Sequence, residues 1–221
     1  MRQYSIDARN IKNPIYPCPI KMGGKNANGQ MLSIGNYYLS LNGKPFFGIC
    51  GEAHFSRMDR ELWEDEIIKM KAGGLNIIAT YIFWIHHEEI EGTFDFSGNK
   101  DLRFFLELCK KNNMYVILRI GPFSHGECRN GGFPDWMYGQ PFDIRCDDPS
   151  YLFYTRRFYE QIYQQAKGLL FKDNGPVIGV QLENEHEHAS CPWEMTTENS
   201  KEWVVSGHDG KNHMNTLKQM A

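Results

Sequence analysis

The segment of the chain best supplied with reactive groups runs from Gln181 to His188 and reads Gln-Leu-Glu-Asn-Glu-His-Glu-His. It sets three carboxylates and two imidazoles directly after an apolar run at residues 177–180. Carboxylates and imidazoles act as general acids and bases, and both also bind metal ions. Because buried strands rarely end in so many ionisable groups without a purpose, this crowding predicts the rim of an active site.

The elements that must position these groups alternate along the chain. Strands are predicted at residues 45–50, 76–84, 114–120 and 176–182. A helix capped by Asp59 and a helix after Asp101 are predicted between them, with a third opened by Asp148 and Pro149. A last helix is expected from about Lys211.

This alternation, with strands almost continuous in apolar residues, predicts an α/β fold with a parallel sheet. A doubly wound nucleotide-binding sheet would open its first helix with a Gly-rich turn, but residues 50–54 offer one glycine among bulky side chains. Polar residues instead follow every strand, which suits the carboxyl-end face of a barrel. These residues are Glu52, His54, Arg57, His86, His87, Glu88, Arg119, Glu127, Asn184 and Glu185. We therefore predict a TIM-type (β/α)8 barrel, of which the chain covers about the first four β/α units.

Composition narrows the classes of function. The chain has 221 residues, is 41% hydrophobic and carries a net charge of -3. No basic field for nucleic acid and no apolar stretch of about 18 residues for a bilayer are present. The first residues lack the apolar core of a signal peptide, so a cytoplasmic location is expected. The six cysteines show no Cys-x-x-Cys pair, which predicts reduced packing residues, and nothing indicates an oligomeric state.

Seven stretches together resemble glycoside hydrolase family 35, the retaining β-galactosidases. They occur in the order of that family, and the most specific are "RIGPF" followed by "NGGFPDW" and then "GPVIGVQLENE". The matching stretches are residues 42–46, 52–57, 63–74, 80–88, 118–122, 131–136 and 181–185. The resemblance implies that residues 1–41 form an extension leading into the first strand, and that residues 42–221 form the N-terminal half of a catalytic barrel.

The resemblance assigns roles to four residues. Glu185 would be the acid/base, with its pKa raised by an ionised nucleophile nearby. Asn184 would hydrogen-bond the sugar 2-hydroxyl, while Glu127 and Tyr81 would contact the sugar. Strict alternation would send Asn184 and Glu185 to opposite faces of the sheet, so we expect the strand to end or bulge there.

Other roles are less specific. His54 and Arg57 are expected to line or brace the floor of the site, and Trp84 and Trp136 to be rim aromatics on which a sugar stacks. The alternatives are ordinary: aromatic packing for the tryptophans, a solvated loop carboxylate for Glu185, and structural support for His54 and Arg57. For Glu127 the alternative is an ion pair with Arg119 or Arg129. Glu183 and Glu187 are interpreted as surface or supporting charges.

The family nucleophile is a glutamate at the end of the seventh strand, which implies that it lies outside this chain. We therefore expect a truncated half of the enzyme, with no turnover by itself. Three departures from the family pattern put strict galactose preference in doubt. They are Ile85 for an asparagine, Cys128 for a tryptophan, and His186-Glu187 for Tyr-Gly.

Two other classes of function stay open. A metal-dependent hydrolase could use His125 with Cys128, or His186 and His188 with Cys191, but these lie in predicted loops and not at helical spacing. No metal and no cofactor are therefore expected, and chelator sensitivity would discriminate. The other class is a carbohydrate-binding relic, identified by binding of the sugar without hydrolysis.

Overall fold

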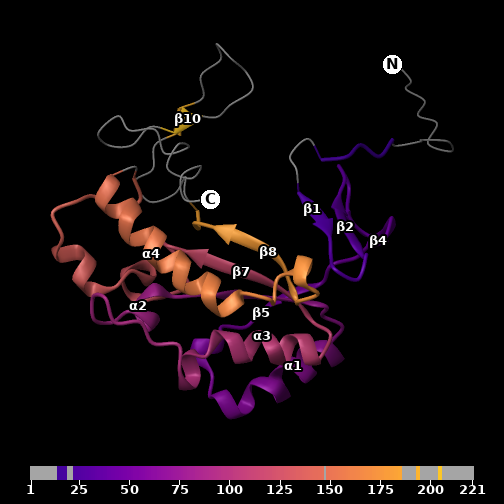
Figure 1. Ribbon diagram of the computed structural model, residues 1–221, viewed down its shortest axis with the longest axis horizontal. Coiled ribbons are helices and arrows are strands. Elements are labelled where there is room, and N and C mark those ends of the chain that lie inside the picture. Colours follow the sequence, from indigo (N-terminus) through magenta and orange to yellow (C-terminus); the bar gives the residue numbers. More distant parts are fainter. Residues whose placement is uncertain (1–13, 19–21, 147, 186–192, 195–203, 206–221) are drawn as a thin grey trace, which may run out of the picture. The chain divides into compact units, whose positions relative to one another are not determined.

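The computed structural model describes residues 14–18, 22–146, 148–185, 193–194 and 204–205 (Figure 1). The chain divides into two compact units, Met1–Gly48 and Ile49–Ala221. The sequence prediction began the barrel at residue 42, whereas this division falls after Gly48.

The described part of the first unit is an antiparallel sheet in the order β1-β2-β3-β4. Its last two strands are joined by Asn42 and Gly43, whose φ angles of 54° and 75° fit the two-residue turn of a tight hairpin. The strands are β1 (Gly23–Lys25), β2 (Met31–Ile34), β3 (Leu39–Leu41) and β4 (Lys44–Phe46).

The second unit contains a parallel sheet in the order β5-β6-β7-β8. Its strands are β5 (Cys50–Glu52), β6 (Ile77–Tyr81), β7 (Tyr115–Gly121) and β8 (Val177–Leu182). The prediction of a single first strand at residues 45–50 is wrong, because Pro45 belongs to β4 of the other unit and Cys50 opens β5. Pro45 has no N–H to donate and therefore suits β4, which is an edge strand.

Among the described residues, four α-helices accompany this sheet: α1 (Trp63–Ala72), α2 (Trp84–His87), α3 (Leu102–Lys111) and α4 (Pro149–Ala166). The predicted cap at Asp148 is confirmed, since its side chain accepts from the Ser150 amide at 2.8 Å. Asp101, after which a helix was predicted, caps α3 in the same way and accepts from the Phe104 amide at 2.9 Å. Asp59 makes no capping bond and precedes a short 3-10 turn, so the prediction that it caps a helix is wrong.

In the described part of the chain, no helix combines the length and apolar character needed to cross a bilayer. The helix predicted from Lys211 lies outside the described residues.

The core lies between the sheet and the three longer helices. Trp63 of α1, Phe105 of α3 and Phe158 of α4 belong to one buried cluster with Val116 and Leu118 of β7. Along β7 these buried residues alternate with half-buried Tyr115, Ile117 and Arg119, which face the other way. Helices α1, α3 and α4 thus pack on the face that Val116 and Leu118 share, and Arg119 points to the opposite face.

Candidate active site

Neighbouring strands place their polar residues side by side. The parallel register pairs Tyr81 of β6 with Arg119 of β7, and Arg119 with Gln181 of β8. Paired positions in a parallel sheet point to the same face, so these three side chains form one row. Glu52 at the end of β5 joins the row through an ion pair with Arg119.

Arg119 organises this row. Its guanidinium lies 3.7 Å from the centre of the Tyr81 ring and donates from Nε to Gln181 Oε1 at 3.0 Å. Its Nη2 donates to Asn184 Oδ1 at 2.8 Å, and Gln181 Nε2 donates to the same oxygen at 3.2 Å. Because Oδ1 of Asn184 is occupied in this way, its Nδ2 amide is the end that can donate to a ligand.

Glu185 follows on a bent backbone. Strand β8 ends at Leu182, and Glu183 and Glu185 adopt φ angles of 57° and 45°. This confirms the expectation that the strand ends before the Asn184-Glu185 pair. The Glu185 carboxylate is about half exposed and lies 3.1 Å from Nδ1 of His125, while Asn184 is buried against Arg119. The two side chains are thus both presented at the end of β8.

Backbone strain concentrates around this carboxylate. His125 and Glu127 on the loop after β7, Arg145 before α4, and the two glutamates after β8 all have positive φ. A positive φ is energetically unfavourable for residues other than glycine. Such residues cluster at functional sites, where side chains must be placed accurately. The strained loops after β7 and β8 therefore mark the same region as the polar row.

Tyr81, which belongs to the row, and His54 form a wall of the site, with their ring centres 5.1 Å apart. Tyr81 is 4% exposed, and burial together with the charges of Glu185 and Glu127 raises the pKa of its phenol to about 12. Burial and the neighbouring Arg57 charge lower the pKa of His54, so its ring is neutral near pH 7. Nδ1 of His54 accepts from the Tyr81 amide at 3.3 Å, which fixes the tautomer. Both predicted residues lie at the site, and His54 also braces β6.

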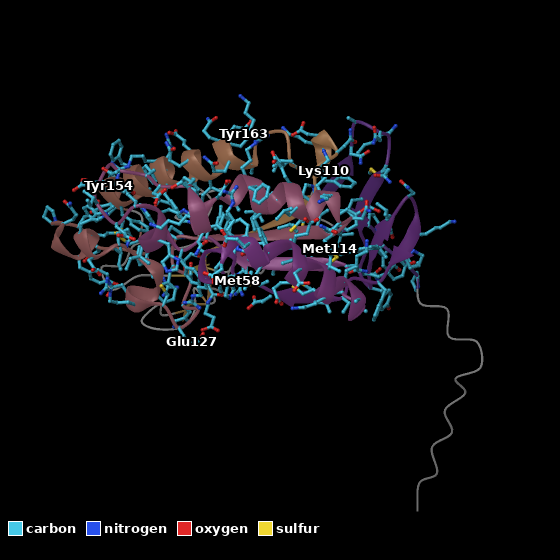
Figure 2. The ribbon with its side chains drawn as sticks, turned by 90° about the horizontal axis from the view of Figure 1, so that it is seen from below. Met58, Lys110, Met114, Glu127, Tyr154 and Tyr163 are labelled. Atoms are coloured by element: carbon cyan, nitrogen blue, oxygen red, sulfur yellow. The ribbon has the colours of Figure 1, made fainter. Side chains whose placement is uncertain are left out.

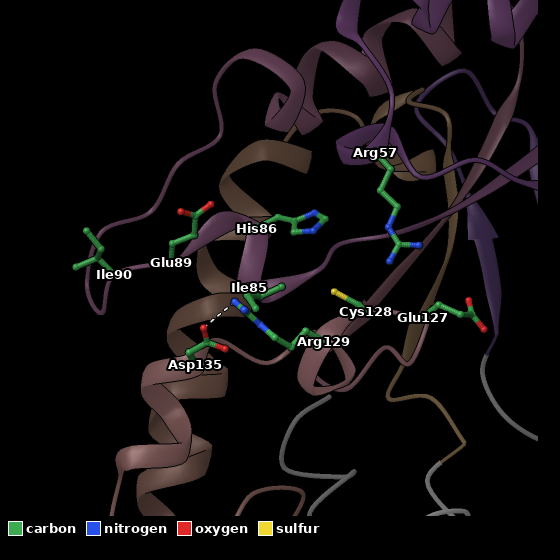
Figure 3. A pocket seen from close by; sticks show the side chains of 9 residues that line it. All are labelled: Arg57, Ile85, His86, Glu89, Ile90, Glu127, Cys128, Arg129 and Asp135. Atoms are coloured by element: carbon green, nitrogen blue, oxygen red, sulfur yellow. Dashed lines mark hydrogen bonds and ion pairs between the residues drawn. The ribbon is translucent and has the colours of Figure 1, made fainter.

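Glu127 lies on the side of this unit opposite to Tyr163 of α4 (Figure 2). It borders a pocket of about 710 Å³ together with Arg57, which lies 4.3 Å from the centre of the Phe83 ring (Figure 3). The remaining lining residues are Ile85, His86, Glu89, Ile90, Cys128, Arg129 and Asp135. Arg119 pairs with Glu52 and Arg129 with Asp135, so within the described residues neither arginine forms the alternative ion pair with Glu127.

Trp84 is not at the rim, and that prediction is wrong. Its side chain is fully buried, its ring stacks on Phe158 at 4.6 Å, and Nε1 donates to Glu88 Oε2 at 2.6 Å. The chain leaves β6 after Tyr81 and opens α2 with Trp84, which carries the indole into the helix layer. Trp136 is half-buried and donates from Nε1 to the Glu88 carbonyl at 2.9 Å.

Of the side chains considered as metal ligands, His125 and Cys128 lie among the described residues. Among the described residues, no group of three or more His, Cys, Asp or Glu side chains could hold a metal ion. His125 contacts Glu185, and Cys128 packs against the cluster of Tyr81, Phe83 and Ile85. His186, Glu187, His188 and Cys191 lie outside the described residues.

The sequence analysis assigned no role in the site to three contributors, Arg119, Gln181 and Arg145, although it placed Arg119 among the polar residues that follow the strands. The sequence does indicate a role for Arg119, because an arginine inside the apolar run of residues 114–120 requires buried partners. Gln181 follows from the strand register, which the sequence alone does not provide. Arg145 lies in a loop and donates to Glu183 and to two carbonyl oxygens far along the chain.

Comparison with known sequences gives one family. The sequence model described as Glycosyl hydrolases family 35 matches residues 38–219. A beta-galactosidase of Xanthomonas manihotis is 36% identical over 169 residues, which cover 76% of this chain and 28% of that protein. A beta-galactosidase of Homo sapiens is 38% identical over 167 residues, which cover 74% of this chain and 25% of that protein. The chain thus spans about a quarter of the length of these relatives.

Solved structures support the fold. An exo-beta-1,4-mannosidase from an Opitutaceae bacterium superposes with a TM-score of 0.50 at 16% identity, covering 74% of this chain and 26% of that one. An endo-1,4-beta-mannanase from Rhizomucor miehei gives a TM-score of 0.50 at 16% identity, covering 70% of this chain and 48% of that one. At such identities the likeness shows the fold alone. Together with the parallel sheet, they confirm the prediction of a partial (β/α)8 barrel.

Proposed function

Because the chain belongs to glycosyl hydrolases family 35, we propose that the natural protein hydrolyses terminal β-D-galactosyl residues by a retaining double displacement. The observation that carries the proposal is the presentation of Asn184 and Glu185 at the end of β8, beside the row of Tyr81, Arg119 and Gln181. The relatives named beta-galactosidase supply the choice of sugar.

Glu185 is the acid/base in this proposal. In its protonated form it donates to the glycosidic oxygen as the bond to the anomeric carbon breaks, and it then takes a proton from the water that attacks the glycosyl intermediate. Its half-exposed carboxyl group is accessible for both steps. The mechanism also requires a nucleophile, a second carboxylate about 5 Å from Glu185.

Asn184 and Glu127 bind the sugar. Nδ2 of Asn184 donates to the 2-hydroxyl, and Arg119 keeps the amide in the orientation that this contact needs. The exposed Glu127 carboxylate accepts from hydroxyl groups of the sugar. Tyr81 forms the wall, with His54 behind it and Arg57 along the pocket.

The pocket beside Glu127 bears on which sugar is accepted. Ile85 and Cys128, two of the positions where the sequence departs from the family pattern, both line it. A small thiol and an aliphatic side chain make different contacts with a hydroxylated ring than an indole and an amide would. The preference for galactose over its epimers is therefore the part of the proposal that most needs measurement.

A panel of nitrophenyl glycosides tests the proposal on the natural gene product. We expect the β-galactoside to be hydrolysed with a kcat/KM at least about tenfold above those of the β-glucoside and the β-mannoside, with no activity on the α-galactoside. We expect a chelator to leave these rates unchanged, because acid/base and nucleophile are carboxyl groups. Equal rates on the three β-glycosides would contradict the assignment of galactose. Binding of galactose by the folded natural protein without any turnover would favour the carbohydrate-binding alternative.

A further inference from the structure

The backbone that carries Asn184 and Glu185 needs support. Glu183 and Glu185 are left-handed, with φ angles of 57° and 45°, and a left-handed conformation is unfavourable for residues other than glycine. The same two bends let Asn184 face Arg119 while Glu185 faces His125. A relaxed, extended chain would lose this arrangement, since successive side chains of a strand point to opposite faces.

The buried side chain of Arg145 stabilises this backbone. It is 8% exposed, and its guanidinium lies 3.9 Å from the centre of the Phe123 ring. Its Nη2 group donates to the Asn184 carbonyl at 3.1 Å and to the Glu185 carbonyl at 3.3 Å. One buried cation thus contacts the main chain of both residues that carry the proposed chemistry.

Glu183 completes the arrangement. It is 2% exposed, and Oε2 accepts from Arg145 Nη2 at 2.7 Å and from the Asn184 amide at 3.2 Å. The phenols of Tyr151 and Tyr159 are buried nearby, and burial together with the charge of Glu183 raises the pKa of both well above 10, so both stay neutral. A buried carboxylate needs a paired cation, and Arg145 provides it.

Glu183 also ties the two loops together. Its Oε1 accepts from the Phe123 amide at 3.3 Å, and its own amide donates to the Gly121 carbonyl at 2.7 Å. The loop after β7, which carries His125 and Glu127, is therefore fixed to the loop after β8.

We propose that Arg145 and Glu183 are positioning residues that hold the Asn184-Glu185 backbone in the geometry required for proton transfer to the glycosidic oxygen. The inference rests on the proposed function, with Glu185 as the acid/base. Neither residue touches the sugar. Their effect is exerted through the carbonyl oxygens and the amide of the main chain, and a displacement of about 1 Å at a catalytic group costs on the order of 10²-fold in rate.

Hydrogen exchange tests the structural part without any turnover. In Arg145→Met, we expect the amides of Phe123 and Asn184 to exchange at least about tenfold faster than in the wild type. The matched control is Arg103→Met. Arg103 also donates to two carbonyl oxygens, those of Gln165 and Lys167, but it lies on the surface of α3. Unchanged exchange at Phe123 and Asn184 in Arg145→Met would overturn the proposal.

Leaving-group dependence of the natural protein tests the catalytic part. For Arg145→Met we expect kcat/KM to fall about 10²-fold on an alkyl β-galactoside, whose leaving group needs a proton, and less than about tenfold on a dinitrophenyl β-galactoside. Arg145→Lys keeps the charge without the planar fork and should recover part of the loss, and it replaces Arg145→Met if that variant does not fold. Arg103→Met should retain the wild-type rates on both substrates.

The outcomes separate the two proposals. Equal losses on both substrates in Arg145→Met, while Glu185→Gln discriminates between them, would overturn the positioning role and leave the proposed function intact. If Glu185→Gln shows no such discrimination, the proposed function fails. The exchange result then decides by itself whether Arg145 holds this backbone.

Discussion

Replacement of Glu185 by glutamine is expected to lower kcat/KM of the natural protein on an alkyl β-galactoside by about 10³-fold, within the range for loss of a general acid. Glutamine keeps the shape of the side chain but cannot deliver a proton. On a dinitrophenyl β-galactoside the same variant should lose about tenfold or less, because that leaving group departs without protonation. Initial rates on the two substrates, each measured below KM, check the expectation.

The matched control for this variant is Glu107→Gln. Glu107 is an exposed glutamate on α3 that pairs with Arg103 at 3.1 Å, and its loss should leave both rates unchanged. A uniform drop on both galactosides in Glu185→Gln, or activity equal to the wild type, would remove Glu185 from the role of acid. Another carboxylate at the carboxyl ends of the strands would then have to be sought.

The second large effect is expected for Arg157→Met, which should lower the free energy of unfolding. Arg157 of α4 forms an ion pair with Glu88, whose side chain is fully buried after α2. Removing one partner of a buried pair leaves an uncompensated charge, which costs about 3 kcal/mol or more. We expect the low end of that range, because Trp84 Nε1 and the Gly92 amide still donate to the carboxylate.

The loss of stability in Arg157→Met should depend on pH. Burial raises the pKa of Glu88 above 4.5, and Arg157 opposes that rise, so removing Arg157 raises the folded-state pKa further. The folded variant then holds a proton that the unfolded chain releases, and its free energy of unfolding falls as pH rises above about 4.5. Urea unfolding at pH 5 and pH 8 should show a larger penalty at pH 8.

Two further variants control this measurement. Arg157→Met combined with Glu88→Gln removes the titrating group and should abolish the extra pH dependence. Arg129→Met breaks the exposed pair with Asp135 and should cost less than about 1 kcal/mol at either pH. A penalty below 1 kcal/mol for Arg157→Met, equal at both pH values, would show that the buried pair does not stabilise the fold.

Part of the site can be predicted from the sequence. Glu127, Asn184 and Glu185 follow strands whose carboxyl ends meet at one face, Tyr81 was added by the resemblance to the family, and all four lie at the carboxyl ends of the strands. The ending of β8 was predicted from the alternation of strand side chains together with the roles that the resemblance implies for Asn184 and Glu185.

The errors have physical causes that lie outside local patterns. The apolar run of residues 76–84 does not show that the strand ends at Tyr81 and that Trp84 opens a short helix. Pro45 was predicted to lie in the first strand of the parallel sheet. It lies instead in β4, which pairs with β3 in the antiparallel sheet of the other unit. Tertiary pairing decides both cases.

The supporting residues were the hardest to foresee. Arg145 is one charged residue in a loop, and its importance arises only when folding places it under Asn184 and Glu185. Its own left-handed φ of 58° is equally invisible in the sequence, since arginine has no preference for that conformation.

The most direct test of the central claim is to follow the hydrolysis of a β-galactoside by the natural protein with proton NMR and to identify the galactose anomer that forms first. A retaining double displacement predicts β-galactose first, with α-galactose appearing only as mutarotation proceeds. If α-galactose forms first, the mechanism inverts and the proposed double displacement is wrong. If no galactose is released, the assignment of this site to β-galactoside hydrolysis fails.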